Sequence, residues 1–549
     1  MPVPLPGYSA RVRYWLTVLG LLLACGPERS VYTGGPILTM DANDRLVEAI
    51  GVEGEHIAVV GSRALVEEWA AGDARVVDLE GRALLPGFID AHGHFPGAGL
   101  YAVNANLNSP PIGQVENMDQ LLERLRSLAA DTPPGDWVVG FGYDDTLLTE
   151  QRHPNREDLD RVSSEHPIAI LHISGHLGVL NSTALAEAGI DADTLDPEGG
   201  RIRRDSDGRP DGVLEETALE SVQGSLLRPS LTDTWAIVKE ASRLYLAAGA
   251  TTAQNGYAAA NHIGPLRWLR RLGVIPLDLV FWPGVEWADP AEPAQTVKIV
   301  ADGSIQGYTG YLSQPYHVPP GDDPSYRGYP RFTREKLASE VERFHAAGWQ
   351  VAVHGNGDAS IDDILDAFEA AQRKHPREDT RHVIIHAQMA REDQLDRMQA
   401  LGVIPSFFSL HTYYWGDRHR DIFMGPERAA RMSPAQSAVQ RGMRFTIHCD
   451  SPVVPMEPLR LVWAAVNRRS ASGAEIGPAQ RILPMQALRA ITIDAAYQHF
   501  EDDEKGSLEP GKRADLVILS RSPLETPASI DQIEVAETII GGESVWRNP

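Results

Sequence analysis

Residues 85–94 read Leu-Pro-Gly-Phe-Ile-Asp-Ala-His-Gly-His, and this stretch decides how the rest of the chain is interpreted. Its apolar run predicts a buried strand, and two histidines follow where that strand ends. In an extended chain residues i and i+2 face the same side, so His92 and His94 can bind one ion together. An isolated pair of this kind is weak support for a metal site, so the interpretation depends on what recurs elsewhere.

Short apolar segments recur through the middle of the chain and alternate with helical stretches. About eight of them are candidate parallel strands, near 84–92, 250–255, 276–282, 296–301, 349–354, 382–387, 402–408 and 444–449. This alternation predicts an α/β fold, a TIM-like (β/α)8 barrel over residues 84–499.

The gap between the first two candidate strands is too long for one crossover connection. It predicts an inserted α/β subdomain at about residues 95–245, with a strand at 167–173 and an amphipathic helix at 117–130. Both ends of the chain differ in composition from the middle: β-branched residues are frequent, and Gly and Asp recur at regular intervals, as in strands joined by turns. Residues 36–83 and 500–549 are therefore expected to form one small composite β-sandwich domain.

Four further ionisable residues sit at or near the ends of the central strands. Lys298 lies in an apolar strand, where an ammonium is costly unless it is neutral, functional or paired, with Asp302 as the alternative partner. His354 and His386 each end an apolar strand, and either one alone is more often a satisfied core residue. Asp450 alone would be a turn residue or helix cap. Together with the first histidine pair, they indicate a zinc-type divalent metal site.

The joint pattern resembles the amidohydrolase superfamily, most closely the branch that includes N-substituted formamide deformylases. The matching motifs cover roughly residues 35–545: PGFIDAHGH (86–94), VKIVADGS (297–304), HGNGD (354–358), RHVIIHAQ (381–388), MGPERA (424–429), CDSPVVPMEPL (449–459) and KGSLEPGKRADLVIL (505–519).

The resemblance implies two divalent ions, expected to be Zn²⁺, and a role for each residue. His92 and His94 would bind the more buried ion, and His354 and His386 the second. Lys298 would bridge the two after carboxylation. A metal-activated hydroxide would then hydrolyse an amide, N-acyl amine or N-formyl amine, a small-molecule substrate, and Asp450 would contact the nucleophile and shuttle its proton.

Other positions match the same branch or depart from it. His176 and Glu216, in the predicted insert, are candidate substrate-binding residues, and Gln254 and Tyr308 are further candidates. Ile385 stands where the branch often has glutamate and, as the strand neighbour of His386, is expected to point away from the metals.

Two more features lie near the last strands. Cys449 is expected to be a buried inert thiol rather than an extra metal ligand. The aromatic segment 406–415 hints at an apolar or aromatic substrate, with packing against the insert as the alternative.

The N-terminus resembles a bacterial lipoprotein signal. Arg11 and Arg13 precede an apolar run at 14–24, which is too short to span a bilayer and ends before Cys25. Residues 1–24 are thus expected to be a signal peptide, Cys25 the lipidated residue and 25–35 a linker, which places the protein in the bacterial cell envelope. The alternatives are an uncleaved anchor or an ordinary signal peptide.

Charge and composition narrow the function classes. The formal net charge is −25, which disfavours binding to a nucleic-acid backbone, and the expected membrane contact is the lipid anchor alone. A homodimer is compatible with the sequence. Three alternatives remain open: a lactone or ester hydrolase, a deaminase on the same scaffold, and a catalytically inactive, lipid-tethered binding protein.

Overall fold

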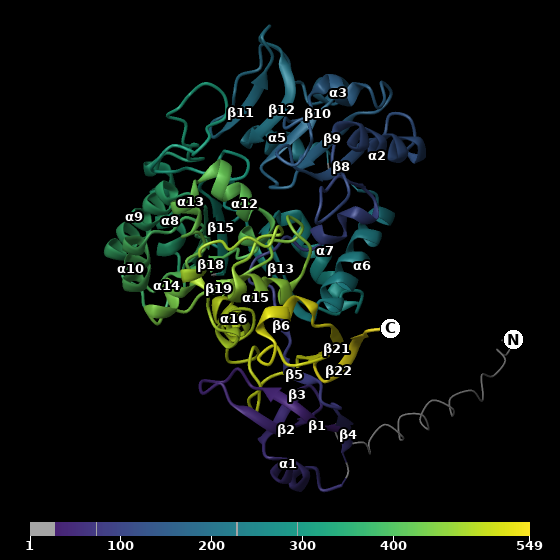
Figure 1. Cartoon of the computed structure of the whole chain (residues 1–549), viewed down its shortest axis with the longest axis vertical. Coiled ribbons are helices and arrows are strands. Elements are labelled where there is room, and N and C mark those ends of the chain that lie inside the picture. The colour runs from purple at the N-terminus through teal and green to yellow at the C-terminus, as the bar shows by residue number, and fades with distance from the viewer. Residues whose placement is uncertain (1–27, 73, 227–228, 294) are drawn as a thin grey trace, which may run out of the picture.

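The computed structural model describes residues 28–72, 74–226, 229–293 and 295–549. The polypeptide is arranged in three regions along the long axis of the molecule: a sheet built from both chain ends, a central parallel β/α region, and an inserted subdomain (Figure 1). In the described part of the chain, no helix has the length and apolarity needed to cross a membrane. The predicted signal peptide and Cys25 lie outside the described residues.

Eight strands from the two chain ends form one sheet, in the order β22-β21-β20-β5-β1-β2-β3 with β4 paired to β1. They are β1 (Arg29–Leu38), β2 (Leu46–Glu53), β3 (His56–Gly61), β4 (Arg75–Asp78), β5 (Ala83–Pro86), β20 (Leu516–Leu519), β21 (Val535–Ile540) and β22 (Glu543–Arg547). Helix α1 (Arg63–Ala70) packs beside them.

This terminal sheet differs from the expectation in two respects. Strand β1 begins at Arg29, so the predicted linker at 25–35 is wrong for residues 29–35. The strands also form one branched sheet instead of two separate sheets. The cause is an irregularity between Thr33 and Ile37, since the first half of β1 pairs with β4 and the second half with β5.

The decisive stretch passes from the terminal sheet into the central region. Strand β5 ends at Pro86 and β6 (Phe88–Ile89) begins after Gly87, so the predicted strand at 84–92 is two short strands in different sheets. Gly87 is needed at this crossing because a Cβ there would lie 2.2 Å from the side chain of Thr251.

The central region contains eight parallel strands in two sheets, ordered β14-β13-β6 and β15-β16-β17-β18-β19. Besides β6 these are β13 (Ala250–Ala258), β14 (Asp278–Pro283), β15 (Thr296–Val300), β16 (Gln350–Gly355), β17 (Val383–His386), β18 (Ile404–Phe407) and β19 (Thr446–Ile447). An isolated bridge joins Gly284 to Lys298, and hydrogen bonds from Asp450 N to His92 O (3.1 Å) and from His94 N to Ser451 O (2.8 Å) join the ends of β19 and β6.

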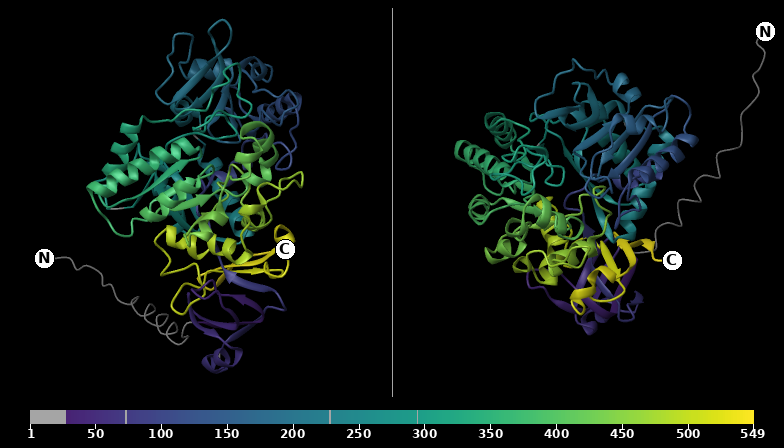
Figure 2. Two further views of the ribbon diagram at one scale, coloured as in Figure 1. Left: turned by 60° about the vertical axis from the view of Figure 1, so that its left-hand side comes forward. Right: turned by 45° about the horizontal axis from the view of Figure 1, so that its top comes forward.

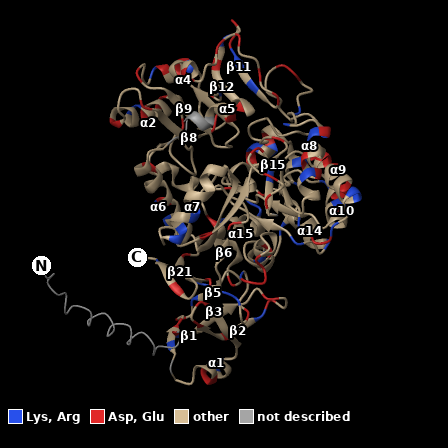
Figure 3. Cartoon of the chain, turned by 180° about the vertical axis from the view of Figure 1, so that it is seen from behind, with Lys and Arg blue, Asp and Glu red and all other residues tan. Residues whose placement is uncertain are grey.

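Helices alternate with these strands and surround them (Figure 2). They are α6 (Leu231–Ala247), α7 (Ala260–Arg271), α8 (Arg334–Ala346), α9 (Asp358–Lys374), α10 (Glu392–Leu401), α14 (Ala435–Gln440), α15 (Pro458–Asn467), α16 (Pro484–Ala490) and α17 (Ile493–Gln498). Acidic and basic residues alternate along α8, α9 and α10 (Figure 3). Arg397 of α10, for example, forms ion pairs with Asp366 and Glu369 of α9.

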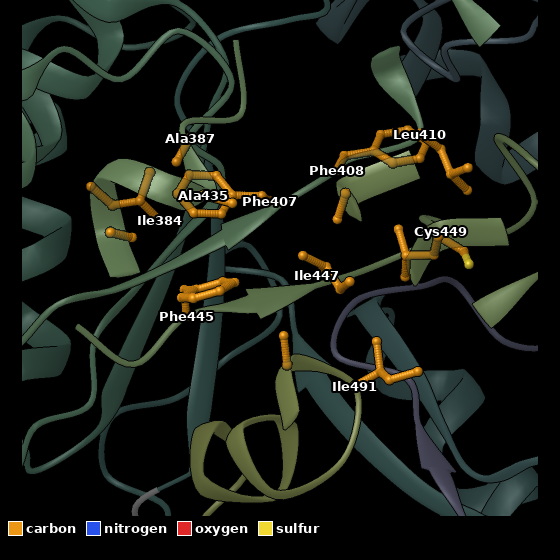
Figure 4. Packing of buried hydrophobic residues seen from close by; sticks show 14 of the residues in the cluster. Ile384, Ala387, Phe407, Phe408, Leu410, Ala435, Phe445, Ile447, Cys449 and Ile491 are labelled. Carbon is orange, nitrogen blue, oxygen red and sulfur yellow. The ribbon is translucent and has the colours of Figure 1, made fainter. Parts of the chain in front are cut away.

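The main apolar core lies between the second parallel sheet and its helices. Figure 4 shows Ile447 and Cys449 in this core, with Ile447 on the side of Phe445. Cys449 is a buried free thiol in this apolar setting, and burial raises its pKa well above the ordinary value. The location agrees with an inert thiol rather than a ligand.

The insert is a six-stranded sheet in the order β11-β12-β10-β9-β8-β7. Its strands are β7 (Ala105–Asn106), β8 (Val138–Tyr143), β9 (Ile168–His172), β10 (Leu177–Leu180), β11 (Gly200–Arg204) and β12 (Pro210–Glu216), with α2 (Met118–Asp131), α3 (Arg156–Asp160), α4 (Ser182–Glu187) and α5 (Thr217–Leu226). The predicted end at 245 is wrong because α6 packs in the core of the first parallel sheet, where Val238 and Tyr245 join Phe95.

Candidate metal centre

Three of the predicted ligands come together at the ends of β6 and β19. His92, His94 and Asp450 offer ligand atoms that all lie within 4.8 Å of one another. His94 Nε2 is 3.2 Å and His92 Nε2 3.7 Å from Asp450 Oδ1. Asp450 Oδ1 is nevertheless buried without a hydrogen-bond partner. Imidazole and carboxylate lone pairs that converge in this way fit a divalent cation.

Lys298 reaches the same place from β15. Its Nζ lies 3.0 Å from His92 Nε2, and the side chain is buried. Among the residues that the structure describes, no ion pair involves Lys298. The alternative partner, Asp302, instead faces His354, with Oδ1 3.1 Å from its Nδ1, and accepts backbone hydrogen bonds from Asn356 and Gly357.

His354 and His386 stand side by side at the ends of β16 and β17. Their ring centroids are 4.6 Å apart, and the His386 ring is 6.0 Å from that of His92. His386 Nε2 lies 3.9 Å from Asp450 Oδ2. The structure therefore brings the six predicted side chains into one cluster, as Asp450 contacts both histidine groups.

Two backbone positions of this cluster are strained. His386 has φ 69° and Asp450 has φ 56°, in the left-handed region that non-glycine residues seldom adopt. Such conformations cost about 1–3 kcal/mol each and concentrate at functional sites. At His386 the unusual φ also interrupts the alternation of side chains along β17.

Burial shifts the ionisation of the cluster toward the forms that bind metals. It lowers the pKa of Lys298 to about 7, against an opposing effect of Asp450. The pKa values of His92, His354 and His386 fall well below the ordinary range, first through burial and then through neighbouring cationic groups. Burial alone would raise the pKa of Asp450, but His94 and other nearby groups lower it to about 2. Neutral imidazoles and a carboxylate are the ligand forms required.

The insert contributes His176 and Glu216 to the edge of the cluster. The His176 ring centroid is 5.1 Å from that of His354, and Nδ1 lies 2.9 Å from Glu216 Oε2. Glu216 is also 3.9 Å from Arg331, which binds Glu220. His94 and His176 keep part of their side chains exposed, at 36% and 16%, so this is the accessible side of the cluster.

The other candidates are distributed unevenly. Gln254 lies at the cluster, with Oε1 2.8 Å from His92 Nδ1, whereas Tyr308 packs against Tyr316 and Phe423. Ile385 belongs to an apolar group that includes Trp282, whose ring stacks on His92. The expectation that Ile385 points away from the imidazoles is therefore wrong, because the left-handed turn at His386 brings both side chains inward.

The aromatic segment 406–415 packs against the insert, which agrees with the alternative prediction for this segment. Trp415 Nε1 donates to Asp144 Oδ2 (3.1 Å), and Arg418 Nη1 donates to the same oxygen (2.6 Å). Asp144 belongs to a second group of possible ligand atoms, with Asp145 and His172. Since two cationic or N–H donors already occupy Asp144, this group connects the insert to the central region.

Two buried residues of the site were missed from the sequence. His448 Nε2 lies 3.1 Å from His386 Nδ1, and Gln498 Nε2 donates to Ala91 O (2.7 Å). His448 precedes Asp450 on the last strand, where a strand-facing rule could have found it. Gln498 ends helix α17, more than forty residues downstream, and carries no local signal.

Comparison with known proteins agrees with this architecture. The amidohydrolase family model matches residues 75–546. The chain is 29% identical over 524 residues to the N-substituted formamide deformylase of Arthrobacter pascens, covering 92% of this chain and 96% of that one. It is 27% identical to the putative amidohydrolase YtcJ of Bacillus subtilis strain 168, covering 94% and 99%.

A solved structure shares the fold. An uncharacterised metal-dependent hydrolase from Pyrococcus horikoshii OT3 superposes with a TM-score of 0.72 at 23% identity, over 91% of this chain and 99% of that one. The chain belongs to the amidohydrolase family. It is a hydrolase of carbon–nitrogen bonds. The group formed by His92, His94 and Asp450 fits a divalent metal ion.

Proposed function

We propose that the eight parallel strands form a TIM-like (β/α)8 barrel whose carboxyl ends carry a centre for two divalent ions, with zinc as the expected metal. The proposed ligands are His92, His94, Lys298, His354, His386 and Asp450. The observation that carries this proposal is the convergence of ligand atoms of His92, His94 and Asp450 within 4.8 Å, with Nζ of the buried Lys298 3.0 Å from His92 Nε2. A lysine pKa near 7 favours the neutral amine that carboxylation requires.

The proposed reaction is hydrolysis of an amide-like carbon–nitrogen bond. Bound divalent ions would supply Lewis acidity, which lowers the pKa of water and polarises a carbonyl group. Asp450 would accept a proton from the attacking water and return it to the leaving nitrogen. Its low pKa keeps the carboxylate ionised before the reaction begins.

The proposed substrate is an N-acyl amine, with N-formyl amines as the first candidates. Similarity to a protein named N-substituted formamide deformylase over nearly the whole chain supports this choice. His176 lies on the accessible side of the cluster and pairs with the buried Glu216, and these two are the proposed substrate-binding residues.

The experiment combines metal analysis with a substrate panel of formamides, N-acyl amines, lactones and aminated heterocycles. The parent chain should contain divalent metal and hydrolyse a formamide or N-acyl amine. Asp450→Asn should keep bound metal and lose about 10²–10⁴-fold in kcat. Turnover of Asp450→Asn at the parent rate would remove the proton-transfer role, and turnover of lactones alone would refute the amide assignment.

The N-terminus supports a further proposal, that Cys25 is lipidated and tethers the enzyme to the bacterial cell envelope. The short apolar run ending before Cys25 supports it. Labelled palmitate should be incorporated by the full chain and not by Cys25→Ala. Equal labelling of both would contradict the anchor.

A further inference from the structure

A chain of buried polar groups leads away from the metal centre, behind His386. We call this set the polar relay. Each member hydrogen bonds to the next, and their side chains are almost fully buried: His386, His448, Ser406, Thr446, Gln498 and the carbonyl group of Ala91. Because water is excluded, each proton in the relay has to be shared between protein groups.

The end of the relay fixes the direction of its hydrogen bonds. Gln498 Nε2 lies 2.7 Å from the carbonyl oxygen of Ala91, which can only accept. Gln498 therefore turns Oε1 toward Thr446 Oγ1, at 2.8 Å, and Thr446 must donate its single hydroxyl proton there. Ser406 Oγ, 2.7 Å from Thr446 Oγ1, then has to donate to Thr446.

The same direction continues to the metal centre. Ser406 has used its proton, so it accepts from His448 Nδ1 at 2.8 Å. His448 consequently carries its proton on Nδ1, and its Nε2 accepts from His386 Nδ1 at 3.1 Å. His386 is left with an Nε2 lone pair, and Nε2 is the atom that faces Asp450.

A shorter path starts from the same carbonyl group and reaches His92. Gln254 Nε2 donates to Ala91 O at 3.2 Å, which orients Gln254 Oε1 toward His92 Nδ1 at 2.8 Å and Gly93 N at 3.3 Å. Oε1 can only accept, so His92 also carries its proton on Nδ1. Its Nε2 lone pair faces Lys298.

We propose that the carbonyl group of Ala91 fixes the tautomers of His92 and His386, through Gln254 and the polar relay, so that both rings present Nε2 to the metal centre. This inference rests on the proposed function. Thr446, Ser406 and Gln498 are positioning residues, since they act on the metal only through an imidazole.

The test is Thr446→Val, a substitution of similar shape three hydrogen bonds away from His386. Without Thr446 Oγ1, Ser406 turns its hydroxyl proton toward His448 Nδ1, and the direction of every hydrogen bond from Ser406 to His386 reverses. His386 then carries its proton on Nε2, and metal binding would leave the Ser406 hydroxyl without an acceptor. Co²⁺ binding by the chelator-stripped full chain should weaken by about tenfold or more, as is typical of changes behind a ligand.

The matched control is Thr446→Ser, which restores the hydroxyl group and should bind Co²⁺ within about twofold of the parent. Gln498→Leu frees Thr446 to donate to Ser406, which also permits reversal, and gives a second route if Thr446→Val does not fold. Thermal unfolding of the stripped variants checks that Thr446→Val and Thr446→Ser are equally folded.

The outcomes separate this inference from the proposed function. Tight Co²⁺ binding by the parent and equally tight binding by both Thr446→Val and Gln498→Leu would overturn the inference alone. Equal weakening in Thr446→Ser and Thr446→Val would do the same, because it would point to packing. Failure of the parent chain to bind Co²⁺ would overturn the proposed function and this inference together.

Discussion

A single methyl group added at Gly256, as in Gly256→Ala, should push the imidazole ring of His92 out of its position. Gly256 lies in β13, between β6 and β14, and a Cβ there would be 2.3 Å from His92 Cε1, 2.4 Å from Nδ1 and 2.7 Å from Gln254 Oε1. The backbone hydrogen bond from Gly256 N to Gly93 O (2.7 Å) limits movement of the backbone, so the imidazole ring has to give way.

The size of the displacement sets the expected effect. Ordinary contacts begin at 3.4 Å, so the ring of His92 must move by roughly 1 Å. A misplacement of that size costs about 10²-fold in rate when it affects a reacting group, and overpacking of a core costs about 1–3 kcal/mol of stability. The same movement would break the hydrogen bond between His92 and Gln254.

Metal content, kcat for the best substrate and thermal unfolding of Gly256→Ala should be measured together. Gly264→Ala is the matched control, since its Cβ would meet nothing within 4 Å and it lies in helix α7. That control should retain metal content and activity, since the added methyl group meets no atom of the candidate site. Parent-level metal content and turnover in Gly256→Ala would refute the assignment of His92 as a ligand.

Three further changes test other parts of the structure. Lys298→Met should lower the number of bound metal ions from two toward one. Lys298→Arg should not restore the second ion, because a guanidinium group is always charged and cannot be carboxylated. Full metal content in either variant would contradict the bridging role. Asp278 pairs with Lys505. Burial alone would raise the pKa of Asp278, but the nearby cations lower it below the ordinary value. The stabilisation by Asp278 is therefore present above the pKa of the unfolded state, near 4, and is lost as the pH falls below that value. The difference between the unfolding midpoints at pH 7 and pH 3 should therefore be smaller for Asp278→Asn than for the parent. An equal difference in the two proteins would disprove the linkage. Arg418→Met should loosen the insert through Asp144, raising KM more than it lowers kcat and exposing the insert to limited proteolysis.

The sequence predicted the parts of the fold that have a regular period. The strand segments near 250–255, 296–301, 349–354 and 382–387 correspond to β13, β15, β16 and β17 within a few residues. Burial on both faces makes such strands continuous apolar runs. The prediction of one strand at 84–92 is wrong because an apolar run does not show that its two halves pair with different partners.

The residues of the candidate site were predictable where they end a strand. His354 follows the alternation of β16 directly, but His386 reaches the cluster only through a φ of 69°, which no side-chain pattern indicates. Gln498 comes from a helix that follows the last central strand, and its hydrogen bond to Ala91 joins residues 407 positions apart. Contacts of that range depend on the packing of the whole fold.

The crossing from β5 to β6 has a consequence for biosynthesis. Strand β5 pairs along its length with β20, which lies near the C-terminus, and β6 leads directly to His92. A ribosome-bound chain released only as far as residue 500 would contain every proposed ligand, yet the segment holding the first two histidines would lack its neighbour. Nascent chains of increasing length should therefore acquire metal only after translation has passed residue 519.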